Sequence, residues 1–345
     1  MEQPLVSVIV VNFNGRHYLA DCLASLQQQR LPREQFEVIV VDNNSADGSV
    51  AWIADNHPSV KLLALEVNAG FARGNNLALR QATGKYIAFL NNDAVAEPAW
   101  LQAAAWTLQE SPELGGVASK IQFRHDPRIL NSTGLVLYSD GRGGDRGFRE
   151  EDHGQFDEAD EVFGPCGAAM VVRRELLDDL GGFDERLFLY YEDLDLAWRA
   201  RLRGWNFHYC PKALVQHVHC ASSREWSPTF CFYVERNRAL VNCKNAPVRM
   251  AAKTSLGLFA RALRAWWRVA RGWNQRAYSA AHGIAYLWAV GSFLYLLPEC
   301  LRERRRIRGS QCRVLDHEIA RFLTEPPRLA ARRNLQSRAR ELACG

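Results

Sequence analysis

Three carboxylates lie within four consecutive positions, where a run of aromatic residues gives way to a helical pattern. They are Glu192, Asp193 and Asp195, and apolar residues then recur at i, i+4 and i+8 from Leu194 to Leu202. This spacing predicts a helix that begins at the carboxylates. The unpaired backbone N–H groups and the dipole of a helix start favour the ionised form of Glu192 and Asp193. An ionised Asp193 could accept a proton from a hydroxyl group; the alternative is that either residue only caps the helix.

Four strongly apolar runs precede these carboxylates, and a helical pattern follows each of them. The runs cover residues 6–11, 36–41, 60–65 and 85–90. Uninterrupted apolar strands that alternate with helices predict an α/β fold with a mostly parallel, Rossmann-like sheet covered on both faces. The sequence has no G-x-G-x-x-G after its first strand and no P-loop, so a dinucleotide-dependent dehydrogenase is poorly supported.

Asparagine and aspartate residues gather where these runs end. They are Asn12, Asn14, Asp42, Asn68 and Asp93. Ligands of open α/β sheets bind outside the carboxyl ends of the strands, so we expect these side chains to converge on one crevice. Each of them alone could be a turn former, but their recurrence at successive strand ends favours a binding site.

Two glycine-containing stretches follow residue 111, where the regular alternation ends. Residues 140–147 and the acidic stretch up to Glu161 predict a long mobile loop, which would be a natural lid over a site. Residues 164–172 predict a turn that leads into a buried strand. The small residues of that turn would let the backbone approach a ligand, or they serve packing alone.

The composition is that of a globular protein with reduced thiols. The hydrophobic fraction is 48% and the charged fraction 23%, which argues against a disordered chain or a polytopic membrane protein. The nine cysteines are odd in number and form no C-x-x-C pair, which indicates free thiols in a cytosolic protein. A zinc site of Cys210, His217, His219 and Cys220 is an alternative without a recognised ligand spacing. The first apolar run is too short for a signal peptide.

Residues 248–345 differ in charge from the rest of the chain. They carry 19 lysines and arginines against 6 aspartates and glutamates. The arginines at positions 261, 264, 268 and 271 share one helical face, and apolar residues trace another. We therefore expect an α/β domain over residues 1–247 and a basic amphipathic helical region over residues 248–345, which would bind an anionic membrane surface. The alternative is a helical subdomain that packs on the first domain with solvated arginines.

One uncharged stretch, residues 283–297, lies within this basic region. It is shorter than the roughly 20 residues needed to cross a bilayer, and arginines flank it on both sides. A monotopic or buried helix is therefore favoured over a transmembrane one. No recognised nucleic-acid-binding motif accompanies the charge, so nucleic acid is not an expected partner.

Residues 5–247 contain an ordered set of short motifs. They are VVNFN (10–14), VDNNSADGS (41–49), NAGFARGNN (68–76), LNND (90–93), GAA (167–169), Glu192-Asp193, and His217 with Ser222. In this order the motifs resemble the inverting family 2 glycosyltransferases of GT-A fold, in particular the rhamnosyltransferase-like members of bacterial surface-polysaccharide pathways. The resemblance implies transfer of a sugar, with L-rhamnose favoured, from a dTDP- or UDP-linked donor to a hydroxyl of a glycan or polyprenyl-diphosphate-linked acceptor.

The resemblance also implies roles for the polar residues. Asp193 would be the general base, and Glu192 would position the loop or bind the acceptor. Asp93 would hold a divalent metal, Mg²⁺ or Mn²⁺, with His217 as a further ligand and His219 as a near alternative. Such a metal neutralises a nucleotide diphosphate leaving group.

The implied donor-binding residues line the strand ends and the loop after the third strand. Asp42 would contact the base or ribose and Arg73 a phosphate, unless Arg73 is merely solvated. The full set is Asn12, Asn14, Asp42, Asn68, Gly70, Arg73 and Asn92. Such an enzyme would work in the cytoplasm, peripherally on the inner face of the cell membrane.

Asn91 departs from the best-known family pattern, which is Asp-x-Asp. With one carboxylate missing, metal affinity would depend on the donor phosphates. Two alternatives remain open: a sugar nucleotidyltransferase, which would release pyrophosphate and need no acceptor base, and a catalytically silent protein that binds a sugar nucleotide or glycan.

Overall fold

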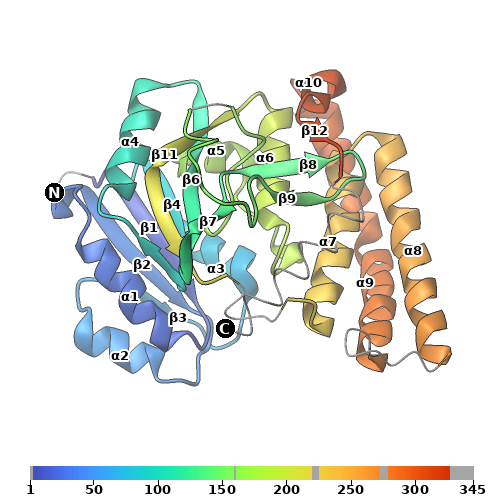
Figure 1. The fold of residues 1–345 in the computed structure, drawn as a ribbon, viewed down its shortest axis with the longest axis horizontal. Coiled ribbons are helices and arrows are strands. Elements are labelled where there is room, and N and C mark those ends of the chain that lie inside the picture. The colour runs from blue at the N-terminus through green and yellow to red at the C-terminus, as the bar shows by residue number, and fades with distance from the viewer. Residues whose placement is uncertain (1–2, 159–160, 220–224, 272–278, 327–345) are drawn as a thin grey trace.

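Nine strands form the central sheet of the described residues, in the order β3-β2-β1-β4-β10-β6-β11-β5, with β7 paired to β6 (Figure 1). The computed structural model describes residues 3–158, 161–219, 225–271 and 279–326. The strands of this sheet are β1 (Val6–Asn12), β2 (Phe36–Asp42), β3 (Lys61–Ala64), β4 (Tyr86–Asn91), β5 (Ala94–Ala96), β6 (Leu114–Phe123), β7 (Asp126–Ser132), β10 (Ala169–Arg173) and β11 (Asn206–His217).

The first four predicted strands form the parallel half of the sheet. β1 lies between β2 and β4 and is parallel to both, and β3 is parallel to β2. Nearly all side chains of β1, β2 and β4 are buried because helices cover both faces. The α/β prediction is therefore confirmed. The helices of this half are α1 (Arg16–Gln27), α2 (Ser49–Asn56), α3 (Gly70–Leu79) and α4 (Trp100–Glu110).

Strand β10 is the buried strand predicted after the turn of small residues. It lies antiparallel between β4 and β6, with Ala169 beside Leu90. Because of this register, the turn before β10 lies at the carboxyl end of β4. Helices α5 (Arg174–Leu180) and α6 (Glu192–Leu202) follow, and β11 then returns parallel to β6.

The stretch predicted as a long mobile loop, from residue 140 to Glu161, contains a paired strand near its start. Strand β9 (Gly143–Asp145) pairs antiparallel with β8 (Leu135–Tyr138), which also pairs with β12 (Leu323–Thr324). A Cβ atom at Gly143 would come within 2.8 Å of the Leu194 side chain. The glycines therefore permit close packing against α6, where the sequence pattern indicated flexibility.

Three long helices stand side by side at one end of the molecule (Figure 1): α7 (Pro228–Asn245), α8 (Val248–Ala270) and α9 (Ala280–Arg305). The short α10 (Asp316–Ala320) follows. The predicted amphipathic helix is present as α8, but its arginines do not share one solvated face. Arg261 is partly buried and forms an ion pair with Glu235 of α7, with 2.6 Å between Nε and Oε2. The division at residue 247 stays a prediction.

Helix α9 is longer than its uncharged stretch suggested. Within the described residues, the segment Ala280–Ser310 has the length and apolar composition of a membrane-crossing helix, and about 28% of its most apolar part is buried. The same features occur in core helices of soluble proteins, and α9 packs against both α7 and α8. The length of the uncharged stretch therefore does not decide between a buried, a monotopic and a membrane-crossing helix, and the preference for a monotopic or buried helix stays a prediction.

Candidate functional site

The strand-end side chains of β1 and β2 form a hydrogen-bonded cluster with the residue after β4. Asn12 Nδ2 donates to Asp42 Oδ2 at 2.9 Å, and Asn92 Nδ2 donates to Asn12 Oδ1 at 2.8 Å. Asp42 Oδ1 also accepts from the backbone N–H of Ser45. The Ser45 hydroxyl oxygen accepts from the backbone N–H of Asn14. Asn12 and Asp42 are fully buried. The structure thus brings together Asn12, Asn14 and Asp42 of the predicted set, with Asn92 beside them; Asn68 and Asp93 do not hydrogen-bond to this cluster.

The loop before α3 is built around Gly70. Asn68 Oδ1 accepts from the backbone N–H of Gly70, whose φ is +78°. A Cβ atom at Gly70 would come within 2.5 Å of the Phe188 ring, so only glycine fits. Arg73 lies on the exposed side of α3, where its Nε is 3.8 Å from Glu185 Oε2.

Asp93 and His217 meet at the far end of β4, where β11 ends. Asp93 Oδ1 lies 3.1 Å from His217 Nε2, and both side chains are buried. His217 Nδ1 lies 2.7 Å from Asn131 Oδ1, an acceptor, so this nitrogen carries a proton. His217 Nε2 also lies 3.2 Å from Asn91 Nδ2. A carboxylate oxygen and an imidazole nitrogen are both ligands that divalent metals accept, so the pair of Asp93 and His217 fits a divalent metal.

Asp93 and His217 supply only two protein ligands. No group of three or more His, Cys, Asp or Glu side chains that could hold a metal occurs among the residues described here. His219, the near alternative, has its Nε2 3.0 Å from Glu225 Oε1. A metal at this corner would therefore take its remaining ligands from the donor phosphates and water.

The zinc alternative finds no support in the described part of the chain. The Cys210 thiol lies 3.5 Å from Thr107 Oγ1 on α4. Cys220 lies outside the described residues, as does Ser222 of the motif set.

Asp193 is not the N-cap of α6. Tyr191 occupies that position with φ +70°, and it provides no side-chain cap. Asp193 Oδ2 accepts from the backbone N–H of Gly167 at 2.9 Å, and Oδ1 accepts from that of Leu194 at 2.7 Å. A Cβ at residue 167 would lie 3.3 Å from Asp193 Oδ2. The turn before β10 and the start of α6 therefore fix this carboxylate between them.

For Glu192 and Asp193, burial raises the pKa by more than the start of α6 lowers it. It raises the pKa of Asp193 to about 6, against the hydrogen bond from Gly167, and the charge of Asp145 adds to the rise. Burial and the neighbouring Asp193 raise the pKa of Glu192 to about 8. Glu192 Oε2 is buried without a hydrogen-bond partner. The helix start favours the ionised form of Glu192, but its burial beside Asp193 favours the protonated form.

Asp145 is a third acidic residue of the site, and the sequence analysis missed it. It lies on β9, within the stretch predicted as a lid. Burial raises the pKa of its carboxyl group, and Oδ1 is buried without a hydrogen-bond partner. Its position depends on the pairing of β8 and β9, which the glycine-rich sequence did not reveal.

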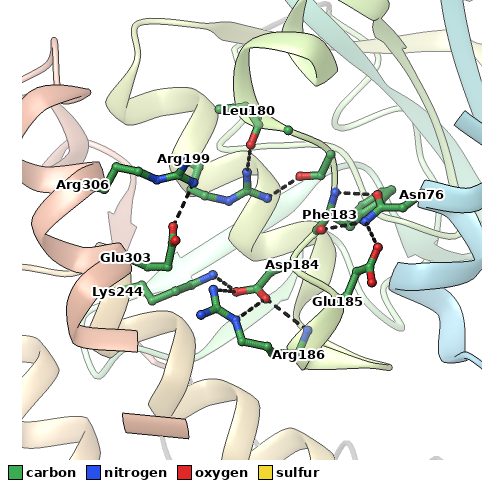
Figure 2. Close-up of a pocket in the computed structure, with 12 residues that line it drawn as sticks. Asn76, Leu180, Phe183, Asp184, Glu185, Arg186, Arg199, Lys244, Glu303 and Arg306 are labelled. Carbon is green, nitrogen blue, oxygen red and sulfur yellow. Dashed lines mark hydrogen bonds and ion pairs between the residues drawn. The ribbon is translucent and has the colours of Figure 1, made fainter. Parts of the chain in front are cut away.

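A polar pocket of about 290 Å³ lies apart from this cluster, between residues 180–186 and the helices α7 and α9. Figure 2 shows its charged side chains grouped around Asp184. Lys244 pairs with Asp184 and with Asp195, and Arg199 pairs with Asp195 at 2.8 Å. The pair of Lys244 with Asp195 joins α7 to α6. None of the predicted site residues lines this pocket.

Residues 7–181 match the family described as Glycosyl transferase family 2. The chain is similar to the O-antigen biosynthesis protein RfbC of Myxococcus xanthus, with 30% identity over 232 residues, but the match spans 64% of this chain and only 18% of RfbC. It is also similar to the N-acetylglucosaminyl-diphospho-decaprenol L-rhamnosyltransferase of Mycobacterium tuberculosis. That identity is 26% over 291 residues, which cover 74% of this chain and 91% of the relative.

Solved structures confirm the expected GT-A fold. The structure of S. aureus TarS 1-349 in complex with UDP has a TM-score of 0.53 and 22% identity, and the likeness covers 92% of this chain and 91% of TarS 1-349. The mannosyltransferase PcManGT from Pyrobaculum calidifontis, in complex with GDP-Man and Mn²⁺, has a TM-score of 0.51 and 20% identity, with coverages of 87% and 88%.

Proposed function

The chain belongs to glycosyl transferase family 2, and we propose that it transfers a sugar, with inversion, from a nucleotide diphosphate donor to a hydroxyl of a glycan or lipid-linked acceptor. The observation that carries the proposal is the placement of Asp193. A half-buried carboxylate with a pKa of about 6 is fixed by Gly167 at the carboxyl end of β4. A general base is most effective when its pKa lies near the working pH.

The donor would bind across the strand ends. The buried Asn12 and Asp42 would hold the partly exposed Asn92 and the exposed Asn14 against the nucleoside, and Asp93 with His217 would hold Mg²⁺ or Mn²⁺ beside the phosphates. A bound divalent cation supplies charge neutralisation for the departing nucleotide diphosphate. Mn²⁺ in the PcManGT structure supports the use of a divalent metal.

Asp193 would remove the proton of the acceptor hydroxyl as its oxygen attacks the anomeric carbon. Attack on the face opposite the leaving group inverts the configuration. Glu192, protonated beside it, is suited to donate a hydrogen bond to the acceptor or to the loop rather than to share the role of base. The two neighbouring acids thus have separate roles because their surroundings differ.

A dTDP-linked deoxysugar such as L-rhamnose is the proposed donor, and a polyprenyl-diphosphate-linked glycan the proposed acceptor, in the synthesis of a bacterial surface polysaccharide. The names of two relatives support this choice, since one is an O-antigen biosynthesis protein and the other an L-rhamnosyltransferase that acts on a decaprenyl-linked sugar.

The proposed function is tested by the release of nucleoside diphosphate from dTDP-, UDP- and GDP-sugars, with and without lipid-linked acceptor. We expect acceptor-stimulated release from one donor. Donor binding without release from any would favour the catalytically silent alternative, and release of pyrophosphate the nucleotidyltransferase.

The α8–α9 surface is the proposed contact with an anionic membrane on the cytoplasmic side. Tryptophans 266, 267 and 288 and Tyr295 are at least half exposed on these two helices. Arg271 lies over the Trp267 ring at 4.0 Å. Exposed indole rings with adjacent arginines are typical of helices that lie in a charged bilayer surface.

Vesicle sedimentation tests this surface. We expect the protein to pellet with vesicles that contain phosphatidylglycerol, less in high salt, and not with phosphatidylcholine vesicles. The double variant Trp266→Ala and Trp267→Ala should lose this binding. Trp106→Ala is the matched control, because Trp106 is equally exposed but lies on α4. Self-association of the protein without vesicle binding would show that a second copy covers the surface.

A further inference from the structure

The loop that leads into α6 has an unusual backbone. Phe188, Tyr190 and Tyr191 have φ values of +64°, +69° and +70°. This left-handed region is unfavourable for residues that carry a Cβ atom, and residues remain there only where their surroundings hold them. Asp193 follows this loop by two residues. The position of Asp193 therefore depends on what holds the loop.

One buried amide on α7 hydrogen-bonds to this loop at several points. Asn237 Nδ2 lies 2.9 Å from the carbonyl oxygen of Leu187, 2.9 Å from that of Leu189 and 2.7 Å from that of Tyr190. Its two N–H groups are thus directed at three carbonyl oxygens of the loop backbone. Asn237 is fully buried, so water does not compete for these bonds.

Arg236 fixes the orientation of this amide. Arg236 Nε donates to Asn237 Oδ1 at 2.8 Å, which leaves the nitrogen of the amide facing the loop. Its Nη2 donates to the carbonyl oxygens of Arg186 and Leu187 at 3.0 and 2.9 Å. Arg236 and Asn237 therefore both bind carbonyl oxygens of the loop backbone rather than its side chains.

The same loop contacts the donor side of the site. The carbonyl oxygen of Phe188 accepts from the backbone N–H groups of Phe71 and Ala72, at the start of α3. The Phe188 ring packs where a side chain on Gly70 would be. The loop thus lies between α3 and α7, and its end sets the start of α6.

We propose that Asn237 is a positioning residue for sugar transfer, which holds residues 187–191 in the one conformation that presents Asp193 at Gly167. The inference rests on the proposed function and adds to it a residue that contacts neither donor nor acceptor. It also gives α7 a part in the reaction, in addition to its packing with α8 and α9.

The test compares Asn237→Ala with Asn242→Ala. Asn242 is a matched control: it is fully buried on the same helix, and its Nδ2 donates to the carbonyl oxygen of Gly141 at 2.7 Å, in another loop. We expect Asn237→Ala to lower kcat by about 100-fold, as small misplacements of a reacting group do, with donor Kd close to that of the wild type. Asn242→Ala should lower Tm similarly and change kcat little.

Hydrogen exchange of the backbone gives a readout independent of activity. Amides of residues 188–194 should exchange faster in Asn237→Ala and at the wild-type rate in Asn242→Ala. Equal losses of kcat in the two variants, or unchanged exchange in Asn237→Ala, would overturn the proposal. If Asn237→Ala does not fold, Arg236→Met removes the support of the amide and must show the same pattern. A wild-type protein that transfers no sugar contradicts the proposed function, whereas the exchange rates still report whether Asn237 holds the loop.

Discussion

Asp193→Asn is expected to abolish sugar transfer while the donor still binds. The amide keeps an oxygen that can accept from Gly167 N–H but cannot take a proton from the acceptor hydroxyl. Loss of a general base typically lowers kcat by about 10²- to 10⁴-fold. Donor affinity should stay close to that of the wild type, because the strand-end cluster does not include Asp193. Release of nucleoside diphosphate measures the first effect and titration calorimetry the second.

The pH profile distinguishes loss of the base from general damage. Asp193 must be ionised to accept a proton, so kcat/KM of the wild type should fall as pH drops below about 6. The residual rate of Asp193→Asn should lack this acidic limb. Asp126→Asn, which removes a carboxylate paired with Arg128 on β7, should leave both rate and profile unchanged. Near wild-type turnover of Asp193→Asn would contradict the assignment.

Asp93→Ala should lower the rate of sugar transfer by at least about 100-fold, which is comparable with the loss of one group that stabilises the charge developing in a transition state. Only two protein ligands are proposed for the metal, so the loss of one leaves His217 alone with the donor phosphates. Asp93→Ala should therefore fail to bind Mn²⁺ in the presence of donor, as followed by electron paramagnetic resonance. A chelator should stop transfer by the wild-type protein.

A graded variant provides the control for this site. Asn131→Ala removes the acceptor that fixes His217 Nδ1 but keeps both ligands. Metal affinity should then fall by about 10- to 100-fold, and added Mn²⁺ should restore the rate. Full activity of the wild-type protein in excess chelator would refute a metal-dependent mechanism.

The parallel half of the fold was predictable because its signal is local. Apolar runs such as residues 6–11 are uninterrupted, and a strand buried on both faces requires this pattern. Strand β9 was not predictable, since Gly143 and Gly144 are typical of a loop unless one knows that Leu194 and Tyr138 pack against them. Contacts with residues distant in the sequence, such as Leu194, determine where β9 forms.

The candidate site was predictable where residue type and strand position agree. Asn12, Asp42 and Asp93 were placed correctly at the strand ends for this reason. The protonation of Glu192 was not predictable, because the helix start visible in the sequence favours charge and only the fold reveals the burial that opposes it. Asn237 was not predictable either, because one asparagine in a helical pattern does not indicate that its amide hydrogen-bonds to a loop 50 residues earlier.

The place of β10 in the sheet has a consequence for the order in which the chain can fold. β4 and β6 do not pair with each other; both pair with β10, which comes about 50 residues after β6. During synthesis on a ribosome, β4 therefore emerges with one edge open and almost wholly apolar, and β6 cannot join it. Open apolar edges are prone to pair with other chains. The emerging amino-terminal half is thus a stage at which a chaperone would protect this protein, until β10 has emerged through residue 173 and covers the edge of β4.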